Sequence, residues 1–321
     1  MKTATAVPVT VENFIRAESD LYMGNLVKEG GLGRFAHRRE PAAIDNQNVI
    51  RLNRDTLYSS AVLDLDTGPA TITLPDPGKR FMAMQVITQD HFTPMVVYGA
   101  GTHTLEKSRM GTRYVVAAIR TLVDPANPSD VKEVHALQDA MQCKQTGTGE
   151  FDVPAWDPAS QKVVREALLV LAATLSDTKG MFGTKAEVDP VRHLLGAAYA
   201  WGGNPQKDAL YLTVTPEQND GTTIHRLTVR DVPVDGFWSI SVYNAAGYFE
   251  KNAAGAYTLN NLTAKKEADG SVAVQFGGCD GKAPNCLPIT KGWNYLVRLY
   301  RPRPEILDGT WTFPPPQPVR G

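Results

Sequence analysis

The residues best suited to chemistry lie directly before a segment with the pattern of a β-strand. Asn53, Arg54 and Asp55 place an amide, a guanidinium and a carboxylate in consecutive positions. A carboxylate can take up and release a proton, and an amide or a guanidinium can hold an oxyanion. We therefore expect Asp55 to act as a general base or acid, with Arg54 or Asn53 binding an oxyanion or a substrate carboxylate.

The segment that follows would position these side chains. From Leu57 to Leu65 an apolar face alternates with a half-polar face, which is the period of a pleated strand. Polar groups at the end of such a rigid element can be held toward a cavity. A plain turn is the alternative, because Asn and Asp side chains often bond nearby backbone amides.

Six further residues are predicted to bind the substrate. They are polar or amphipathic side chains on or beside predicted strands: Tyr58, Gln85, His91, Trp238, Tyr243 and Tyr248. Rings of this kind can line a pocket wall, but they also pack ordinary strands. Gln85 lies on a strand whose two faces are both largely apolar, so it is either a hydrogen-bonding core residue or a pocket residue.

One of these strands has a distinctive face. Between Phe237 and Tyr243 the hydroxyl groups of Ser239, Ser241 and Tyr243 fall on one side, whereas Trp238 falls on the other. Such a face can form one wall of a pocket.

The reaction class follows from what the sequence lacks. It contains no nucleophile elbow, no phosphate-binding loop, no dinucleotide fingerprint and no His-Glu-x-x-His motif. Hydrolysis is the least demanding reaction, because it requires no cofactor. We therefore predict a cofactor-free, hydrolase-like enzyme for a small, partly apolar molecule. The alternative is a non-catalytic envelope protein that binds a ligand or has a structural role.

No metal is expected. The six His residues are scattered, and a ligand set such as Asp55, Asp90, His91 and His103 would have to converge from separate strands.

Charge and hydropathy limit the partners. The 321 residues include 33 Lys and Arg and 34 Asp and Glu, so no global field attracts nucleic acid. No apolar segment is long enough to cross a bilayer. A small-molecule ligand is the expected partner, and homo-oligomer formation stays open. The expected location is the periplasm or cell envelope if a signal peptide has been removed, and the cytoplasm otherwise.

A local basic segment stands out against this neutral background. Arg34, His37, Arg38 and Arg39 follow a Gly-rich turn. Such a cluster could meet an anion, although a solvated charge run is the commoner explanation.

The element pattern predicts a mainly β protein with a helical middle. A helix is expected from Thr10 to about Glu29, with Phe14, Leu21 and Leu26 in its apolar stripe. Three further helices are expected after Ser129, Asp157 and Asp189, and short strands punctuated by Gly and Pro precede and follow them. This pattern indicates two antiparallel β-sandwich or jelly-roll-like domains, at 1–125 and 206–321, joined by a helical connector at 126–205.

The three cysteines leave one question open. Cys279 and Cys286 flank a turn-rich loop of six residues, and they could form a disulfide or stay as free thiols. Cys143 has no partner in either case.

Two stretches carry a family resemblance. The segment from Asn53 to Leu65, with Gly68-Pro69 and Pro75-Asp76 after it, resembles the bacterial domain of unknown function 1254. A second set of motifs resembles its usual companion, domain of unknown function 1214: Asp235 to Ser239, Tyr243, Gly247 to Phe249, Asp269 to Ser271, Arg298 to Pro302 and Asp308 to Trp311.

This resemblance implies the two sandwich-like or jelly-roll-like domains around a helical middle. Members are often exported, so it also implies a processed periplasmic or envelope protein in which Cys279 is bonded to Cys286. The chain looks like a compact variant, because Asn285-Cys286-Leu287-Pro288 stands where many members have Trp-Leu-Pro. The resemblance implies no particular reaction.

Overall fold

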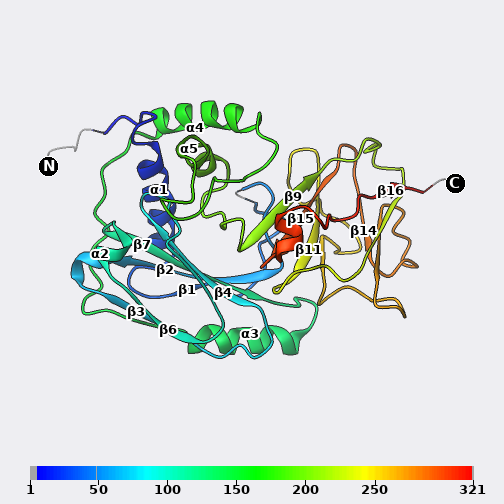
Figure 1. The fold of residues 1–321 in the computed structure, drawn as a ribbon, viewed down its shortest axis with the longest axis horizontal. Coiled ribbons are helices and arrows are strands. Elements are labelled where there is room, and N and C mark those ends of the chain that lie inside the picture. The colour runs from blue at the N-terminus through cyan, green and yellow to red at the C-terminus, as the bar shows by residue number, and fades with distance from the viewer. Residues whose placement is uncertain (1–5, 48, 320–321) are drawn as a thin grey trace. The chain divides into compact units, whose positions relative to one another are not determined.

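The computed structural model of the chain describes residues 6–47 and 49–319. The chain forms two compact units, and each draws on several segments (Figure 1). The first unit contains the residues up to Arg39, Tyr58–Leu122 and Lys132–Gln206. The second unit contains Glu40–Leu57, Val123–Val131 and the chain from Lys207 onward. The helices of the middle region, expected as a connector, therefore belong largely to the first unit.

The first unit is built on two sheets. A five-stranded sheet has the order β1 (Ala36–His37), β2 (Thr56–Asp64), β7 (Tyr114–Leu122), β4 (Met82–Thr88) and β5 (Met95–Tyr98). A three-stranded sheet has the order β6 (Gly101–Leu105), β3 (Ala70–Leu74) and β8 (Gln142–Lys144).

The central strands of the larger sheet are covered on both faces. Every residue of β4 and β7 is buried. One face packs against the three-stranded sheet, where Ile72 meets residues such as Met84 and Ile119. The other face packs against helix α1 (Phe14–Lys28) through Met23 and Val116. The sequence showed apolar side chains on both faces of β4, which is typical of such a central strand.

Three helices lie together in this unit, as Figure 1 shows. They are α1, α4 (Pro158–Ala172) and α5 (Pro190–Tyr199). Asp157 and Asp189 cap α4 and α5, because each side chain accepts hydrogen bonds from backbone amides of the first turn. Both predicted caps are confirmed, including the proline at the first helical position.

Two helix starts differ from the prediction. Helix α1 begins at Phe14 rather than Thr10, since the side chain of Asn13 accepts from the amide of Thr10 and holds the preceding turn. At α3 (Pro128–Ala140) the capping oxygen belongs to Asn127, which accepts from the amides of Ser129 and Asp130. The remaining α-helices in the described residues, α2 (Lys107–Met110) and α6 (Pro304–Leu307), are single turns, and η1 (Leu65–Thr67) is a 3-10 turn after β2.

The buried side of α1 is partly acidic, which the predicted apolar stripe did not include. Leu21 is 40% exposed, whereas Glu18, Ser19 and Asp20 are buried. Each polar residue has a partner on another element. Arg165 on α4 donates two hydrogen bonds to Glu18, at 2.8 and 2.6 Å. Trp201 and Trp156 donate through their indole nitrogens to Ser19 and Asp20. These bonds tie α1 to its neighbours.

The second unit contains two four-stranded sheets. One has the order β12 (Thr258–Asn260), β11 (Trp238–Tyr243), β15 (Asn294–Tyr300) and β9 (Ala209–Val214). The other has the order β14 (Cys286–Leu287), β13 (Val272–Phe276), β10 (His225–Val229) and β16 (Gln317–Pro318).

One apolar core is shared by these two sheets. Trp238, Ile240 and Val297 from the first sheet meet Leu227 and Val274 from the second. The prediction of a mostly β protein with several antiparallel sheets is confirmed. The pair β13 and β14 runs parallel.

Cys279 and Cys286 form a disulfide, and Cys143 is a free thiol. The disulfide joins the loop after β13 to β14. Within residues 6–47 and 49–319, no helix has the length and hydropathy needed to span a membrane.

Candidate functional site

The Asp55 carboxylate lies inside the second unit. Asp55 directly precedes β2 and is 1% exposed. Its Oδ1 oxygen accepts hydrogen bonds from Thr258 Oγ1 and Asn260 Nδ2, both at 3.0 Å. Its Oδ2 oxygen is also buried, and no described residue donates a hydrogen bond to it. One oxygen is therefore fixed while the other is unused.

The hydroxyl face of β11 lies next to these partners. The register of β11 against β12 places Ser239 opposite Asn260 and Ser241 opposite Thr258. Ser241 Oγ lies 3.0 Å from Thr258 Oγ1. Ser239 Oγ is buried and, among the described residues, has no hydrogen-bond partner. The face predicted from alternation thus reaches Asp55 through the side chains of β12.

Arg298 on β15 completes the cluster. Its guanidinium donates to Ser241 Oγ and to the Tyr243 hydroxyl, both at 2.8 Å, and to the carbonyl of Leu52 at 3.1 Å. Arginine has donors only, so Ser241 accepts from Arg298 and can give its own hydrogen to Thr258. Thr258 then donates to Asp55. A directed chain of two hydroxyls links the guanidinium to the carboxylate.

The electrostatics agree with this direction. Burial raises the pKa of Tyr243, so its phenol stays protonated and donates to the carbonyl of Leu52 at 2.8 Å. Burial alone would lower the pKa of Arg298, but the negative charges that Tyr243 and Asp55 can carry raise it above its usual value. Asp55, which Thr258 and Ser241 link to Arg298, is the carboxyl group of the cluster that contributes to this rise.

Asn53 and Arg54 organise the segment before β2. Asn53 Oδ1 accepts from the backbone amide of Asp55 at 2.8 Å, and Asn53 Nδ2 donates to the Tyr300 hydroxyl at 3.1 Å. Arg54 donates to the carbonyl of Ala42, and burial lowers its pKa. The Asp55 carboxylate accepts instead from Thr258 and Asn260. The Asn53 contact is the side-chain-to-amide bond of a turn.

The three predicted aromatic residues of the second unit have different environments. Tyr243 belongs to the Asp55 cluster. Trp238 points to the other face of β11, into the core between the two sheets, where its ring lies 6.1 Å from that of Phe313. Tyr248 is half-buried, and its backbone amide donates to Asn244 at 3.0 Å.

Tyr58 and Gln85 belong to the first unit and share one partner there. Arg120 donates to Gln85 Oε1 at 2.8 Å, and its guanidinium lies 5.5 Å from the centre of the Tyr58 ring. Gln85 Nε2 donates to the carbonyl of Gly203 at 2.9 Å and to Thr93 Oγ1 at 3.2 Å. Gln85 is thus a fully hydrogen-bonded residue of the buried strand β4.

His91 is a buried, neutral imidazole in the same unit. Its Nε2 accepts from the backbone amide of Gly202 at 2.9 Å, and its ring stacks on those of His193 and Trp201. Burial, and to a smaller degree the charge of His193, lowers the pKa of His91 to about 3. Its φ of 63° lies in the left-handed region, which shows that the surrounding packing imposes the conformation.

Sequence reasoning did not assign Arg298, Thr258 or Asn260 to the site. A signal was present for Arg298, which interrupts an otherwise apolar strand. Thr258 and Asn260 lie on a three-residue strand without a periodic pattern, so no signal identifies them.

No metal centre is formed by the described residues, since none of them group as three or more His, Cys, Asp or Glu side chains in reach of one ion.

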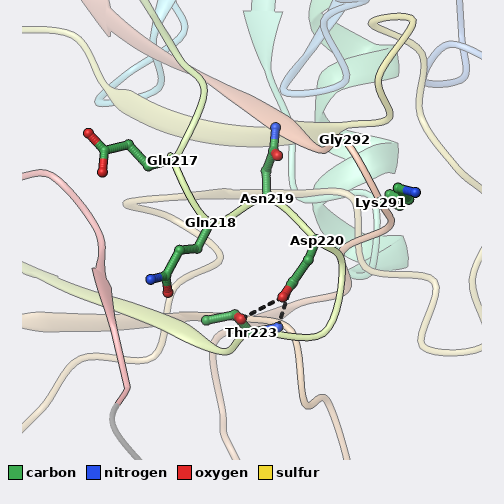
Figure 2. A pocket seen from close by; sticks show the side chains of 7 residues that line it. All are labelled: Glu217, Gln218, Asn219, Asp220, Thr223, Lys291 and Gly292. Atoms are coloured by element: carbon green, nitrogen blue, oxygen red, sulfur yellow. Dashed lines mark hydrogen bonds between the residues drawn. The ribbon is translucent and has the colours of Figure 1, made fainter.

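An open hollow of about 580 Å³ lies elsewhere on the second unit (Figure 2). It is lined by Glu217, Gln218, Asn219, Asp220, Thr223, Lys291 and Gly292. Figure 2 shows the Asp220 carboxylate turned toward Thr223, which donates to it through its amide and hydroxyl at 2.7 and 2.8 Å. These bonds hold the pKa of Asp220 well below its usual value. None of the predicted site residues lines this hollow.

Comparisons with known proteins agree with the architecture. The model of domain of unknown function 1254 matches residues 32–108, and that of domain of unknown function 1214 matches residues 208–304. The chain therefore carries both domains in this order. Its structure is mostly β. The resemblance seen in the sequence is confirmed.

Two crystal structures share the fold. The VPA0106 protein from Vibrio parahaemolyticus is 16% identical, with a TM-score of 0.74 over 97% of this chain and 98% of that chain. An uncharacterized protein from Burkholderia cenocepacia is 12% identical, with a TM-score of 0.52 over 91% and 85% of the two chains. At these identities the likeness concerns the fold alone. No match was found among curated proteins.

Proposed function

We propose that this protein is an exported, hydrolase-like enzyme for a small, partly apolar molecule, with Asp55 as its proton-transfer group. The observation that supports the proposal is the asymmetry of the carboxylate. Oδ1 is held by Thr258 and Asn260, whereas the buried Oδ2 accepts from no described residue. A fixed carboxylate with one unused oxygen is oriented for proton transfer.

The roles of the neighbouring residues follow from their contacts. Asp55 Oδ2 would take a proton from water, and the resulting hydroxide would attack the substrate, after which the proton passes to the leaving group. Arg298 would stabilise the carboxylate through Ser241 and Thr258. Ser239, with its buried and unused hydroxyl, would hydrogen-bond to the water or the substrate. Arg54 and Asn53 would bind an oxyanion only after releasing their present acceptors.

Export is supported by the disulfide. Bonds such as Cys279–Cys286 form and persist in oxidising compartments, which in bacteria means the periplasm or the cell surface. We also propose that each pair of packed sheets is a sandwich-like or jelly-roll-like domain, because each pair shares one apolar core.

The test compares Asp55→Asn with Asp220→Asn. The purified proteins are incubated with a panel of small esters, amides and lactones and with a metabolite mixture, and the products are identified by mass spectrometry. Asp55→Asn should lower turnover at least ~100-fold, the usual size of a general-base contribution. Asp220→Asn changes a carboxylate outside the cluster and should leave turnover as in the wild type. Full activity of a folded Asp55→Asn variant would reject the proposed role.

The second candidate is a non-catalytic ligand-binding protein. It is favoured by the contacts of Asn53 and Arg54, whose donors already bind acceptors of their own unit. In that case the same incubations should raise the melting temperature without forming a product, as mass action on the folded state requires.

A further inference from the structure

A hollow of about 400 Å³ lies in the first unit, beside the edge strands β1 and β8. Its lining combines basic and apolar side chains with one amide: Arg34, Phe35, His37, Met141, Gln142, Cys143 and Lys144. No carboxylate lines it. The hollow is separate from the Asp55 cluster, and it includes part of the basic segment that the sequence marked.

The positive charges at this hollow are not neutralised. The neighbouring arginines of the basic segment are paired, Arg38 with Glu29 and Arg39 with Asp139. Arg34 instead uses its Nε to donate to the carbonyl of Gly30 at 2.9 Å, and no carboxylate among the described residues pairs with it. Lys144 likewise has no ion-pair partner in the described part of the chain. Two cations therefore line the hollow without a carboxylate partner in the described residues.

The other part of the lining is mainly apolar. Met141 is buried, and Phe35 and Cys143 pack against the main core of the first unit. Burial raises the pKa of Cys143, so its thiol stays neutral near pH 7. Burial and the charge of Arg39 lower the pKa of His37, whose Nδ1 lies 2.8 Å from Ser59 Oγ. The histidine thus adds a ring to the lining and little charge.

We propose that this hollow binds a small organic carboxylate with an apolar body. Arg34 and Lys144 would hold the carboxylate, since a guanidinium fork and an ammonium are the usual partners of that group. Phe35, Met141 and Cys143 would contact the body of the ligand. The hollow is open to solvent, and its volume of about 400 Å³ has room for a small ligand of this kind. This site is independent of the proposed enzymatic function.

Cys143 provides a direct test, because it is the free thiol of a chain whose other two cysteines are bonded. The native protein is alkylated in parallel with iodoacetate, which is a carboxylate, and with neutral iodoacetamide. The ratio of the two rates at Cys143 is compared with the ratio for N-acetylcysteine. A carboxylate site should raise the ratio about threefold or more, as expected of solvent-exposed ion contacts. Phenylacetate should slow the iodoacetate reaction in a saturable way.

Two variants and a matched control locate the effect. Arg34→Gln and Lys144→Gln should each return the ratio toward that of N-acetylcysteine, with an unchanged iodoacetamide rate that shows unchanged access to the thiol. Arg38→Gln removes a paired charge of the same segment and should leave the ratio high. The proposal is overturned if the wild-type ratio equals that of N-acetylcysteine. It is also overturned if Arg38→Gln lowers the ratio as much as Arg34→Gln does, because a diffuse positive field would then explain the preference.

Discussion

Asp55 Oδ1 accepts a hydrogen bond from Asn260 Nδ2 at 3.0 Å, although the two residues are 205 positions apart. The bond shows that the segment before β2 is folded into the second unit together with the C-terminal strands. Thr258, two residues from Asn260, makes the second bond to the same oxygen. The candidate site therefore depends on a contact between distant parts of the sequence.

Arg298 is predicted to be a major source of stability for this cluster. Arg298→Met leaves the hydroxyls of Ser241 and Tyr243 without this donor, and the carbonyl of Leu52 keeps only the hydrogen bond from Tyr243. The cluster also loses its buried positive charge. We expect a loss of about 3–5 kcal/mol in the free energy of unfolding, measured with urea. Arg226→Met is the control, because Arg226 is exposed and, among the described residues, its side chain binds Gln275, so about 1 kcal/mol or less is expected. Equal losses in the two variants would contradict the predicted role.

Glu18 on α1 should stabilise the first unit through its bonds to α4. Glu18→Gln removes the buried negative charge that pairs with Arg165. The side chain of Arg165 is 28% exposed. The expected cost is about 2–3 kcal/mol, below that of a fully buried pair because solvent reaches the arginine. Glu166→Gln on the exposed face of α4 should change the free energy of unfolding by about 0.5 kcal/mol or less. Chemical denaturation of both variants measures the two losses in the free energy of unfolding, and equal losses would contradict the prediction.

We predict that His91 makes the free energy of unfolding depend on pH, with lower stability at lower pH. Its pKa falls from 6.5 to about 3 on folding, so the unfolded chain binds the proton more tightly than the folded chain does. The contribution of neutral His91 to the free energy of unfolding is fully present above pH 6.5. This contribution is lost as the pH falls from 6.5 toward 3. The slope from this residue is about 1.4 kcal/mol per pH unit in that window.

His91→Asn should flatten this slope, since asparagine also tolerates a positive φ but does not titrate. The free energy of unfolding is measured for both proteins from pH 8 to pH 4. The difference at pH 8 reports lost packing, and only its change with pH tests the prediction. Parallel curves over the whole range would show that His91 titrates alike in both states.

The disulfide should stabilise the second unit. Cys279→Ser combined with Cys286→Ser opens a short loop, and we expect a loss of about 2–3 kcal/mol from the chain entropy of the unfolded state. Dithiothreitol should lower the melting temperature of the wild type but not that of the double variant. Cys143→Ser is the control that should keep the response to reductant. A wild type indifferent to reductant would count against a stabilising disulfide.

Local patterns predicted much of this architecture. The alternation between Phe237 and Tyr243 identified the hydroxyl face of β11, because a strand turns successive side chains to opposite faces. The Asp-Pro pairs at 157 and 189 identified two helix starts, since both the carboxylate cap and the proline act within one turn. Such features depend only on residues close together in the sequence.

The site could be predicted only in part. Asp55 and Tyr243 were proposed as site residues. Their link through Thr258 and Arg298 depends on which strands pair, and local sequence patterns do not predict strand pairing. For the same reason the acidic side of α1 was missed. Glu18 and Asp20 are buried because partners from later segments, such as Arg165 and Trp156, satisfy them.

The second unit contains segments that lie far apart in the sequence and are therefore synthesised at different times. Glu40–Leu57 leaves the ribosome early, yet β11, β12 and β15, which pack around it, belong to the last third of the chain. During synthesis, Asp55 and the carbonyl of Leu52 stay solvated until their hydrogen-bond donors have been synthesised. A protein cut short before Arg298 would lack the donor to Ser241, Tyr243 and the carbonyl of Leu52, so its second unit would stay incompletely folded and open to quality-control proteases.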